Sequence, residues 1–480
     1  MGLNVVFSIV GKYGILLLQK NLFLSKLMKK EGKMRFKILF LSLMLSTSAF
    51  ALDPFSVYSQ NAPEGCVSGL DTNKEVDLAN LIQIAICNNP ALNRDFMSVK
   101  SREADLGATK SEYLPTVSAS AGAEKNFNKN QDDDKTEKSN PYSANIGIGW
   151  LIYDFGRRGA TTDQMRAYLE SESFNYNSAL QELVLNVNQA YFDLLSNQEV
   201  LKSAQESVKS YKKSYEETSK RYQLGMVSLS DKLLAQTTYQ KSELAVLQAQ
   251  NAIEKSAATL ATLLNLPADT KFDLVLPKRD KDNDITKLQT DMTVQQMMET
   301  AVQLRPEMKS ALSSQDAARY GIDIAKTGHY PTISAKGSAG YNDSWVDSRP
   351  YQMSANAGLS VSVPIFDGFK TTYGVQKARF QYKKAEAGVQ DIKESIQKEV
   401  FNAYQDYTTA VSSYKVNQEV LKSAKESERV TFVSYQAGKE SILNLLTAQA
   451  QLADARQGLA VSFYGVLTAK AKLYRAIGQF

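Results

Sequence analysis

The most constraining feature of this chain is a long stretch without a helix breaker. From Gly156 to Tyr222 there is no proline, and glycine occurs only at the very start. A seven-residue repeat of mostly apolar side chains runs through it at Val187, Leu194, Leu201, Val208, Tyr215 and Tyr222. A stripe sustained this long specifies helices packed side by side in a supercoil. Such a helix spans roughly 100 Å at 1.5 Å per residue, so we do not expect a compact soluble domain.

The second feature is an internal duplication. The segment 114–119 (LPTVSA) recurs as 330–335 (YPTISA), 216 positions later. Further on the offset is 213, which matches Asp154 with Asp367, Gly225 with Gly438, Leu233 with Leu446 and Gln236 with Gln449. The seven-residue stripe returns at Val400, Tyr407, Tyr414, Leu421, Glu428 and Tyr435. We therefore expect residues 52–266 to form a first structural repeat, 267–291 a linker, and 292–480 a second repeat.

Each copy also predicts a β-hairpin between helices. An amphipathic helix opens the copy and continues to about Tyr113, where the residue before Pro115 is pushed out of the α region. Residues 116–123 then alternate between apolar and small polar side chains, a polar loop covers 126–140, and a second alternating run leads to Asp154. Long helices follow and turn back at Gly225 and Gly438.

The hairpins cannot close a barrel by themselves. Strands of about ten residues are long enough to cross a bilayer when tilted. Two hairpins give four strands, whereas the smallest bacterial barrels have eight, and open edges cannot lie in lipid. Three chains would supply twelve strands, so we predict a homotrimer. The loops 126–140 and 341–351 are then hairpin tips that face the outside of the cell.

Charge and hydropathy indicate export. Residues 1–51 carry eight Lys or Arg and one acidic residue, which leaves a near-neutral body of 48 basic and 50 acidic residues without the positive field that nucleic-acid binding needs. We expect 1–51 to be an upstream extension and signal peptide, with translation starting at Met34 and cleavage after Ala51. No later run of 18 apolar residues predicts a spanning helix.

No motif predicts an enzyme. The single histidine, His329, precedes Tyr330-Pro331 at a helix-to-strand junction and is better explained by capping or packing than by catalysis. Nucleotide-binding, paired-cysteine and nucleophile motifs are absent from the sequence, so we expect neither a cofactor nor a metal. The acidic run 132–134 could be read as a calcium site, but a solvated loop explains it better.

Taken in order, these features resemble the TolC-like outer-membrane efflux protein family over essentially 76–480. The shared signs are the duplication, Asn89-Pro90 and Arg305-Pro306, the Leu-Pro-Thr strand entry, the strand exits at 153–157 and 366–370, and the two glycine turns. The resemblance implies a trimeric 12-stranded outer-membrane β-barrel continued by a periplasmic α-helical barrel. Such a protein is an export duct, and without a nucleotide site we expect it to be passive and coupled to a pump. It also implies a periplasmic adaptor protein, an inner-membrane transporter (ABC or proton-driven) and outer-membrane lipid as partners. Cargo stays open between drugs and secreted proteins, although Cys87 before Asn88-Asn89-Pro90 resembles the type I secretion branch.

Two sets of residues become site candidates. Cys66 and Cys87 lie in the exported part, where thiols oxidise, and a bridge between them would contribute on the order of 3 kcal/mol; two free thiols are the alternative. The resemblance also places a periplasmic gate at the helix turns, with Asp231 and Tyr435 linking neighbouring coils. Glu440 stands where the family's type member has an arginine, and Asn444 and Thr447 stand where it has inward aspartates.

Other interpretations remain. The gate candidates could be ordinary turn residues, with Asp231 near a helix N-terminus where the dipole favours a carboxylate. A trimeric coiled-coil surface structure, such as an adhesin stalk, would also carry heptads. That alternative does not explain two hairpins between long helices.

Overall fold

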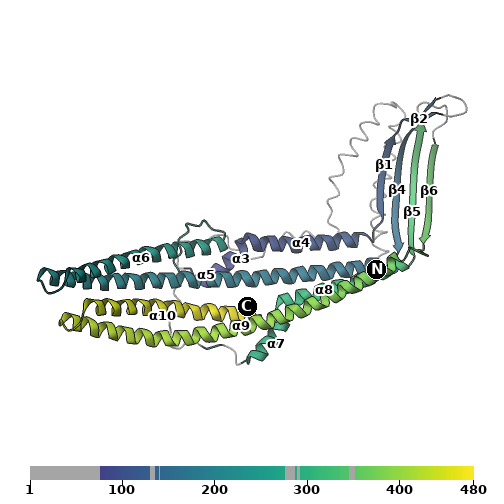
Figure 1. Cartoon of the computed structure of the whole chain (residues 1–480). Helices are drawn as coiled ribbons and strands as arrows, with labels where there is room; N and C mark the ends of the chain where they lie inside the picture. The colour runs from purple at the N-terminus through teal and green to yellow at the C-terminus, as the bar shows by residue number, and fades with distance from the viewer. Residues whose placement is uncertain are drawn as a thin grey trace. The chain divides into compact units, whose positions relative to one another are not determined.

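The computed structural model describes residues 76–129, 136–139, 141–275, 287–288, 292–344 and 352–479, all within one compact unit that begins at Asn61 (Figure 1). The expected signal peptide, Cys66 and the acidic run 132–134 lie outside these ranges.

Four long helices form the body, two from each copy. They are α5 (Arg157–Gln223), α6 (Leu229–Leu263), α9 (Lys370–Gln436) and α10 (Ile442–Ile477). Helices α5 and α9 both have 67 residues, and each is followed by a return helix packed beside it. The return helix α10 also packs against α5, which joins the second copy to the first (Figure 1).

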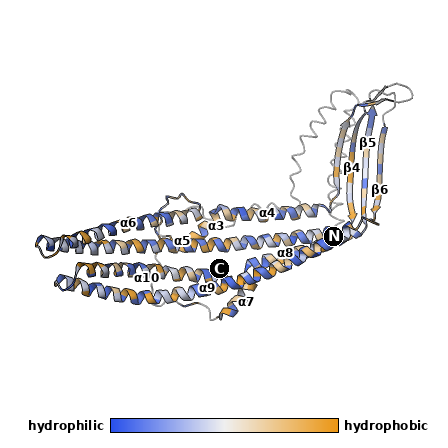
Figure 2. Cartoon of the chain, viewed as in Figure 1, coloured by the Kyte–Doolittle hydropathy of each residue, from blue (hydrophilic) through white to orange (hydrophobic). Residues whose placement is uncertain are grey.

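The seven-residue stripe faces the packed side of both long helices, as predicted. None of its twelve positions is exposed, and Val187 and Val400 are fully buried. Hydrophilic and hydrophobic residues are interleaved along every long helix, as expected for helices with one packed and one exposed face (Figure 2).

The opening helix of each copy is divided, and the prediction of one helix through Tyr113 was wrong. The pieces are α3 (Leu78–Asn88) and α4 (Pro90–Ser111) in the first copy, and α7 (Val294–Leu304) and α8 (Pro306–Lys326) in the second. Proline restricts the preceding residue, so Asn89 is extended with ψ 119°. The Asn89 side chain then caps α4 by accepting from the backbone N–H groups of Ala91 and Leu92 at 3.0 and 3.1 Å.

Both predicted hairpins are present and join into one antiparallel sheet. Its strands are β1 (Thr116–Ala123), β4 (Pro141–Tyr153), β5 (Thr332–Ser344) and β6 (Gln352–Ser362), in the order β1-β4-β5-β6. Pairing of β4 with β5 connects the two copies. The described parts of the expected loop 126–140 differ from the prediction, since β2 (Asn126–Lys129) pairs with β3 (Thr136–Ser139) as a short extra hairpin.

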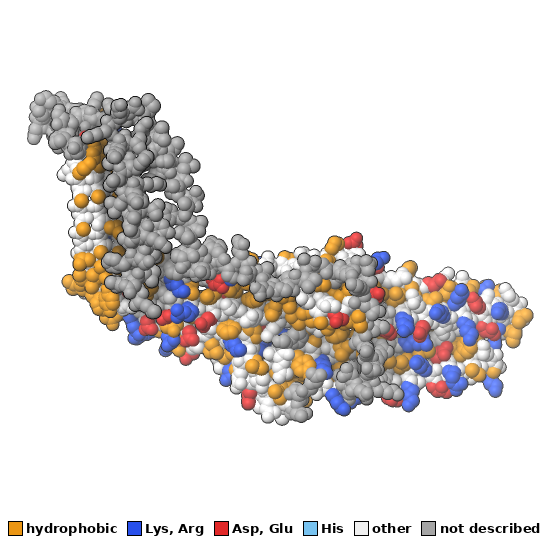
Figure 3. Space-filling model, turned by 180° about the vertical axis from the view of Figure 1, so that it is seen from behind, with side chains coloured by type: hydrophobic (Ala, Val, Ile, Leu, Met, Phe, Trp, Pro, Cys, Tyr) orange, Lys and Arg blue, Asp and Glu red, His pale blue; other side chains and the backbone are white. Residues whose placement is uncertain are grey.

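The sheet register separates an apolar face from a polar one. Val117 lies opposite Ile148, which lies opposite Gly337, which in turn lies opposite Ala357. The adjacent row is uncharged and polar or small: Ser118, Gly147, Ser338 and Asn356. Charged side chains gather over the helices, while the visible strands carry mainly hydrophobic and uncharged ones (Figure 3). A sheet with one apolar and one polar face suits a wall between lipid and water.

In both copies an aspartate lies between the last strand and the long helix that follows it. Asp154 and Arg158 form a buried ion pair at 2.9 Å, and the same carboxylate accepts from the Arg158 backbone N–H. In the second copy Asp367 accepts from the Thr371 backbone N–H at 2.8 Å and from its hydroxyl. The matched aspartates therefore each satisfy one free backbone N–H in the first turn of α5 and α9.

An ionic cluster joins α8, α9 and α10, with its two arginines largely buried and Glu399 43% exposed. Arg305 pairs with Glu307 at 3.0 Å and with Glu399 at 2.6 Å, and Arg475 contacts the same two carboxylates at 3.0 and 2.5 Å. The Arg305 side chain is only 4% exposed. Burial would raise the pKa of Glu307, but the hydrogen bonds and charge of Arg305 outweigh it and lower the pKa to about 2.

We predict that Arg305→Met destabilises the protein by about 2 kcal/mol at pH 7, because Glu307 and Glu399 each lose one of their two arginine partners. The folded pKa of Glu307 lies below its ordinary value of 4.5. The stabilisation is therefore present above pH 4.5 and is lost as the pH falls toward 2. Thermal unfolding followed by circular dichroism should show a smaller difference between variant and wild type at pH 3 than at pH 7. Arg319→Met, which removes an exposed ion pair with Asp316, is the control with little change. An Arg305→Met deficit independent of pH would contradict the ionic role.

Candidate gate at the helix turns

The two long helical hairpins turn in the same way. Gly225 and Gly438 have φ of +72° and +70°, a region that favours glycine. At the first turn the N–H of Gly225 donates to the Tyr222 carbonyl at 3.0 Å, and that of Met226 to the Arg221 carbonyl at 2.9 Å. The second turn repeats both bonds. This pair of bonds is the Schellman ending of a helix, so the prediction of breaks at both glycines is confirmed.

Asp231 acts within its own helix start. The Ser228 hydroxyl accepts from the Asp231 backbone N–H at 3.1 Å, while the Asp231 carboxylate accepts from the Ser228 N–H at 3.1 Å and hydroxyl at 2.8 Å. These bonds form a capping box at the start of α6. The structure thus gives Asp231 the helix-start position that the alternative interpretation assigned to it.

The corresponding start of α10 carries a different arrangement. Ser441 caps the helix through the Asn444 N–H at 3.1 Å, but the Asn444 amide side chain donates to the Glu440 carboxylate at 2.6 Å. The Thr447 hydroxyl donates to the Leu443 carbonyl at 2.9 Å. Glu440, Asn444 and Thr447 are all exposed. Their spacing of four and three residues places them on one face at the tip, with Glu440 as the carboxylate of the three.

Tyr435 is buried and links α9 to α5. It is 2% exposed, and its hydroxyl lies 2.8 Å from that of Thr218. The guanidinium of Arg221 lies 4.8 Å from the ring centroid and also donates to the Gln436 carbonyl at 2.7 Å. Within the described part of one chain, no hydrogen bond joins Tyr435 to Asp231.

Further up the hairpins is a buried polar cluster that sequence reasoning missed. The Gln449 amide of α10, 3% exposed, donates to Ser214 at 2.9 Å and Ser210 at 3.0 Å, both on α5. Glu428 of α9 accepts from the same amide at 3.4 Å. A glutamine repeated in both copies, at 236 and 449, inside a mostly apolar helix face was the signal that could have identified it.

The remaining site candidates from the sequence are the cysteines and the histidine. Cys87 lies near the end of α3 and takes part in a disulfide, but Cys66 is outside the described residues, so its pairing stays a prediction. His329 is exposed in the short 3-10 helix η2 (Thr327–His329).

The described side chains include no cluster of His, Cys, Asp and Glu able to hold a metal ion. Among the helices of the described ranges, none has the length and apolarity to span a membrane.

Comparison with known proteins agrees with this architecture. Protein CyaE of Bordetella pertussis is 26% identical over 400 residues, covering 82% of each chain. Outer membrane protein TolC of Escherichia coli is 23% identical over 427 residues, covering 86% of this chain and 84% of TolC. The solved CmeC outer membrane channel of Campylobacter jejuni superposes with a TM-score of 0.72 at 19% identity, covering 84% of this chain and 85% of CmeC.

The family model described as "Outer membrane efflux protein" matches residues 81–266 and 297–479, one segment in each structural repeat. The resemblance inferred from the sequence is thereby confirmed. The chain therefore belongs to the outer membrane efflux protein family, and it is an export duct of the outer membrane with a helical tunnel in the periplasm.

Proposed function

We propose that three copies of this chain close into one duct, with a twelve-stranded barrel in the outer membrane and a continuous helical tunnel below it. The observation that carries the proposal is the four-stranded sheet with one apolar and one polar face, in which β1 and β6 each pair on one side only among the described strands. Lipid offers no hydrogen bonds to such edges, so strands of further copies are needed to satisfy them. The apolar face then meets lipid and the polar face lines the channel.

The duct does not supply energy. The sequence has no nucleotide-binding glycine loop, and transport therefore depends on an inner-membrane transporter, either ABC-type or proton-driven, reached through a periplasmic adaptor protein. The inner-membrane transporter determines whether the cargo is a drug or a secreted protein.

The periplasmic end is closed at the helix turns. The Tyr435–Thr218 hydrogen bond supports this role, because it ties α9 to α5 close to both glycine turns. Opening requires the helical hairpins to move apart, and this bond opposes that movement. Asp231 contributes by holding the start of α6 in place.

We predict that purified protein gives discrete single-channel steps in a planar bilayer, and that Tyr435→Phe raises the resting conductance. The variant removes the hydroxyl that bonds Thr218 and preserves the ring. Tyr435→Phe is a cleaner test than its combination with Asp231→Ala, because Asp231 also caps α6. Tyr373→Phe, on the same helix but 68% exposed, should leave the conductance unchanged. A coiled-coil stalk would give no steps at all, and steps unaffected by Tyr435→Phe would refute only the gate.

We also predict weak cation selectivity and poor block by trivalent cations from the periplasmic side. Three-fold symmetry turns any inward carboxylate into three close negative charges that attract polyvalent cations. Asn444 and Thr447 carry no charge, which leaves Glu440, held by Asn444 at 2.6 Å, as the remaining acid. Tight block that disappears in Glu440→Gln would show that the acidic ring has moved to Glu440. Tight block that survives Glu440→Gln would place the gate elsewhere.

A further inference from the structure

The polar face of the four-stranded sheet carries a single charged side chain among the described strands. This face consists of the alternate residues that share rows with Ser118, Gly147, Ser338 and Asn356. Lys336 of β5 belongs to this set, and every other position in it is uncharged. The Lys336 side chain is exposed. A lone lysine on an otherwise uncharged face therefore needs an explanation.

The surroundings of Lys336 leave its charge without a counter-charge. In the sheet register Lys336 lies between Gly149 of β4 and Gly358 of β6, neither of which has a side chain. A Cβ added at Gly358 would meet no atom within 4 Å, so the surface beside the lysine is open. Its nearest neighbours on the same face of β5 are Ser334 and Ser338. Among the residues that the structure describes, none forms an ion pair with Lys336.

The other charged residue of the described sheet, Asp343, belongs to the opposite face. It lies opposite Tyr142 in the register, in the apolar set of rows. Its carboxylate accepts hydrogen bonds from the hydroxyls of Tyr142 and Tyr341 at 2.5 and 2.9 Å. The sheet thus separates its charges, with a hydrogen-bonded carboxylate on the apolar face and an unpaired ammonium group on the polar face.

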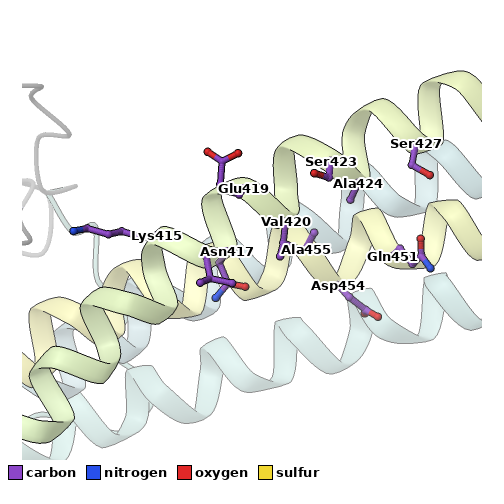
Figure 4. A pocket seen from close by; sticks show the side chains of 11 residues that line it. Lys415, Asn417, Glu419, Val420, Ser423, Ala424, Ser427, Gln451, Asp454 and Ala455 are labelled. Atoms are coloured by element: carbon purple, nitrogen blue, oxygen red, sulfur yellow. The ribbon is translucent and has the colours of Figure 1, made fainter.

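Charges on the helices are mixed in sign, unlike the charge on the polar face of the sheet. In the groove on α9 and α10, Lys415 shares the walls with Glu419 and Asp454 (Figure 4). Elsewhere on α9 the guanidinium of Arg429 pairs with Glu426 at 2.7 Å. Opposite charges this close cancel over longer distances. An unpaired lysine on an uncharged face, by contrast, keeps its field.

We propose that Lys336 forms a positive ring in the barrel, which favours anions over cations and binds polyvalent anions. The proposal rests on the proposed duct, whose polar face lines the channel, and names the residue that sets the charge preference of the barrel. Three-fold symmetry places three ammonium groups at one level of the channel. Their fields reach about 10 Å at roughly 0.1 M salt but only about 3 Å at 1 M.

The internal duplication supplies a matched position for the test. With the offset of 216, Lys336 corresponds to Ser120 of β1, which lies on the same face of the sheet. Ser120 shares its row with Gly340, four positions beyond Lys336 on β5. Strands in a barrel are tilted and staggered, so matched positions of successive hairpins lie at one level although their rows differ. Lysine would then occupy three of six equivalent positions, and Ser120→Lys would fill the others.

Reversal potentials of the purified channel in a KCl gradient across a planar bilayer test the ring. At roughly 0.1 M salt, Lys336→Gln should raise the permeability ratio of potassium to chloride by about threefold, and Ser120→Lys should lower it by about as much. Lys336→Arg keeps the charge and should leave the ratio unchanged. Asp343→Asn removes a charge from the apolar face and should also leave it unchanged. All these differences should fade at about 1 M salt, because the charges are screened.

Two further measurements report on the position of the charge. Hexacyanoferrate, a small polyvalent anion, should block the wild-type current from the outer side and should require about tenfold more anion in Lys336→Gln. In Lys336→Cys, a cationic thiol reagent should restore the wild-type permeability ratio, and an anionic reagent should shift the ratio toward potassium. Cys87 takes part in a disulfide and does not compete for the reagent.

The outcomes separate this inference from the duct itself. Conducting Lys336→Gln channels with the permeability ratio and anion block of wild type would refute the positive ring and leave the duct intact. An equal shift in Lys336→Arg, or no effect of either thiol reagent, would also refute the ring, because the effect would not depend on a charge in the channel. Absence of conductance steps in the wild-type protein would refute the duct.

Discussion

The unpaired edges of the four-stranded sheet are the constraint on which the rest of the structure depends. Every backbone N–H and C=O in a bilayer needs a partner within the protein. In the described part of the chain, β1 and β6 have one neighbour each. In the proposed duct, the outer-membrane location of the family makes this antiparallel sheet one segment of a larger barrel wall, which other copies would complete.

The helical part also has apolar side chains that the chain itself leaves uncovered. Duplication gives each chain two similar helical hairpins, but residues at matching positions differ in burial. Leu229 and Leu233 of α6 are each 50% exposed, whereas Ile442 and Leu446, at the matching positions of α10, are buried. About 25 cal/mol is gained per Å² of apolar surface removed from water, so covering these leucines would favour assembly of the proposed trimer.

Much of the fold could be predicted because its signals are periodic. The seven-residue stripe predicted α5 and α9, and the alternation at 116–123 predicted β1. Both glycine turns were correct because a left-handed residue is most easily supplied by glycine. The division at Asn89 was missed, since helical spacing continues across it and proline is compatible with the first turn of a new helix.

Side-chain roles were less predictable, because they depend on contacts distant in sequence. Arg305 replaces the capping asparagine of the first copy, and only the fold brings Glu399 and Arg475 to it. Asp231 has a sequence context that fits both a gate and a helix cap, and the structure shows the cap. The role of Gln449 was not predicted, because its hydrogen-bond partner Ser214 lies on α5, far away in sequence.

Native mass spectrometry of the full protein released from detergent micelles tests the central claim, that one chain cannot close and three can. The account predicts a single dominant species with three times the mass of the processed chain, and no folded monomer at micromolar concentration. A stable, folded monomer, or a dominant assembly of two or four chains, would contradict it.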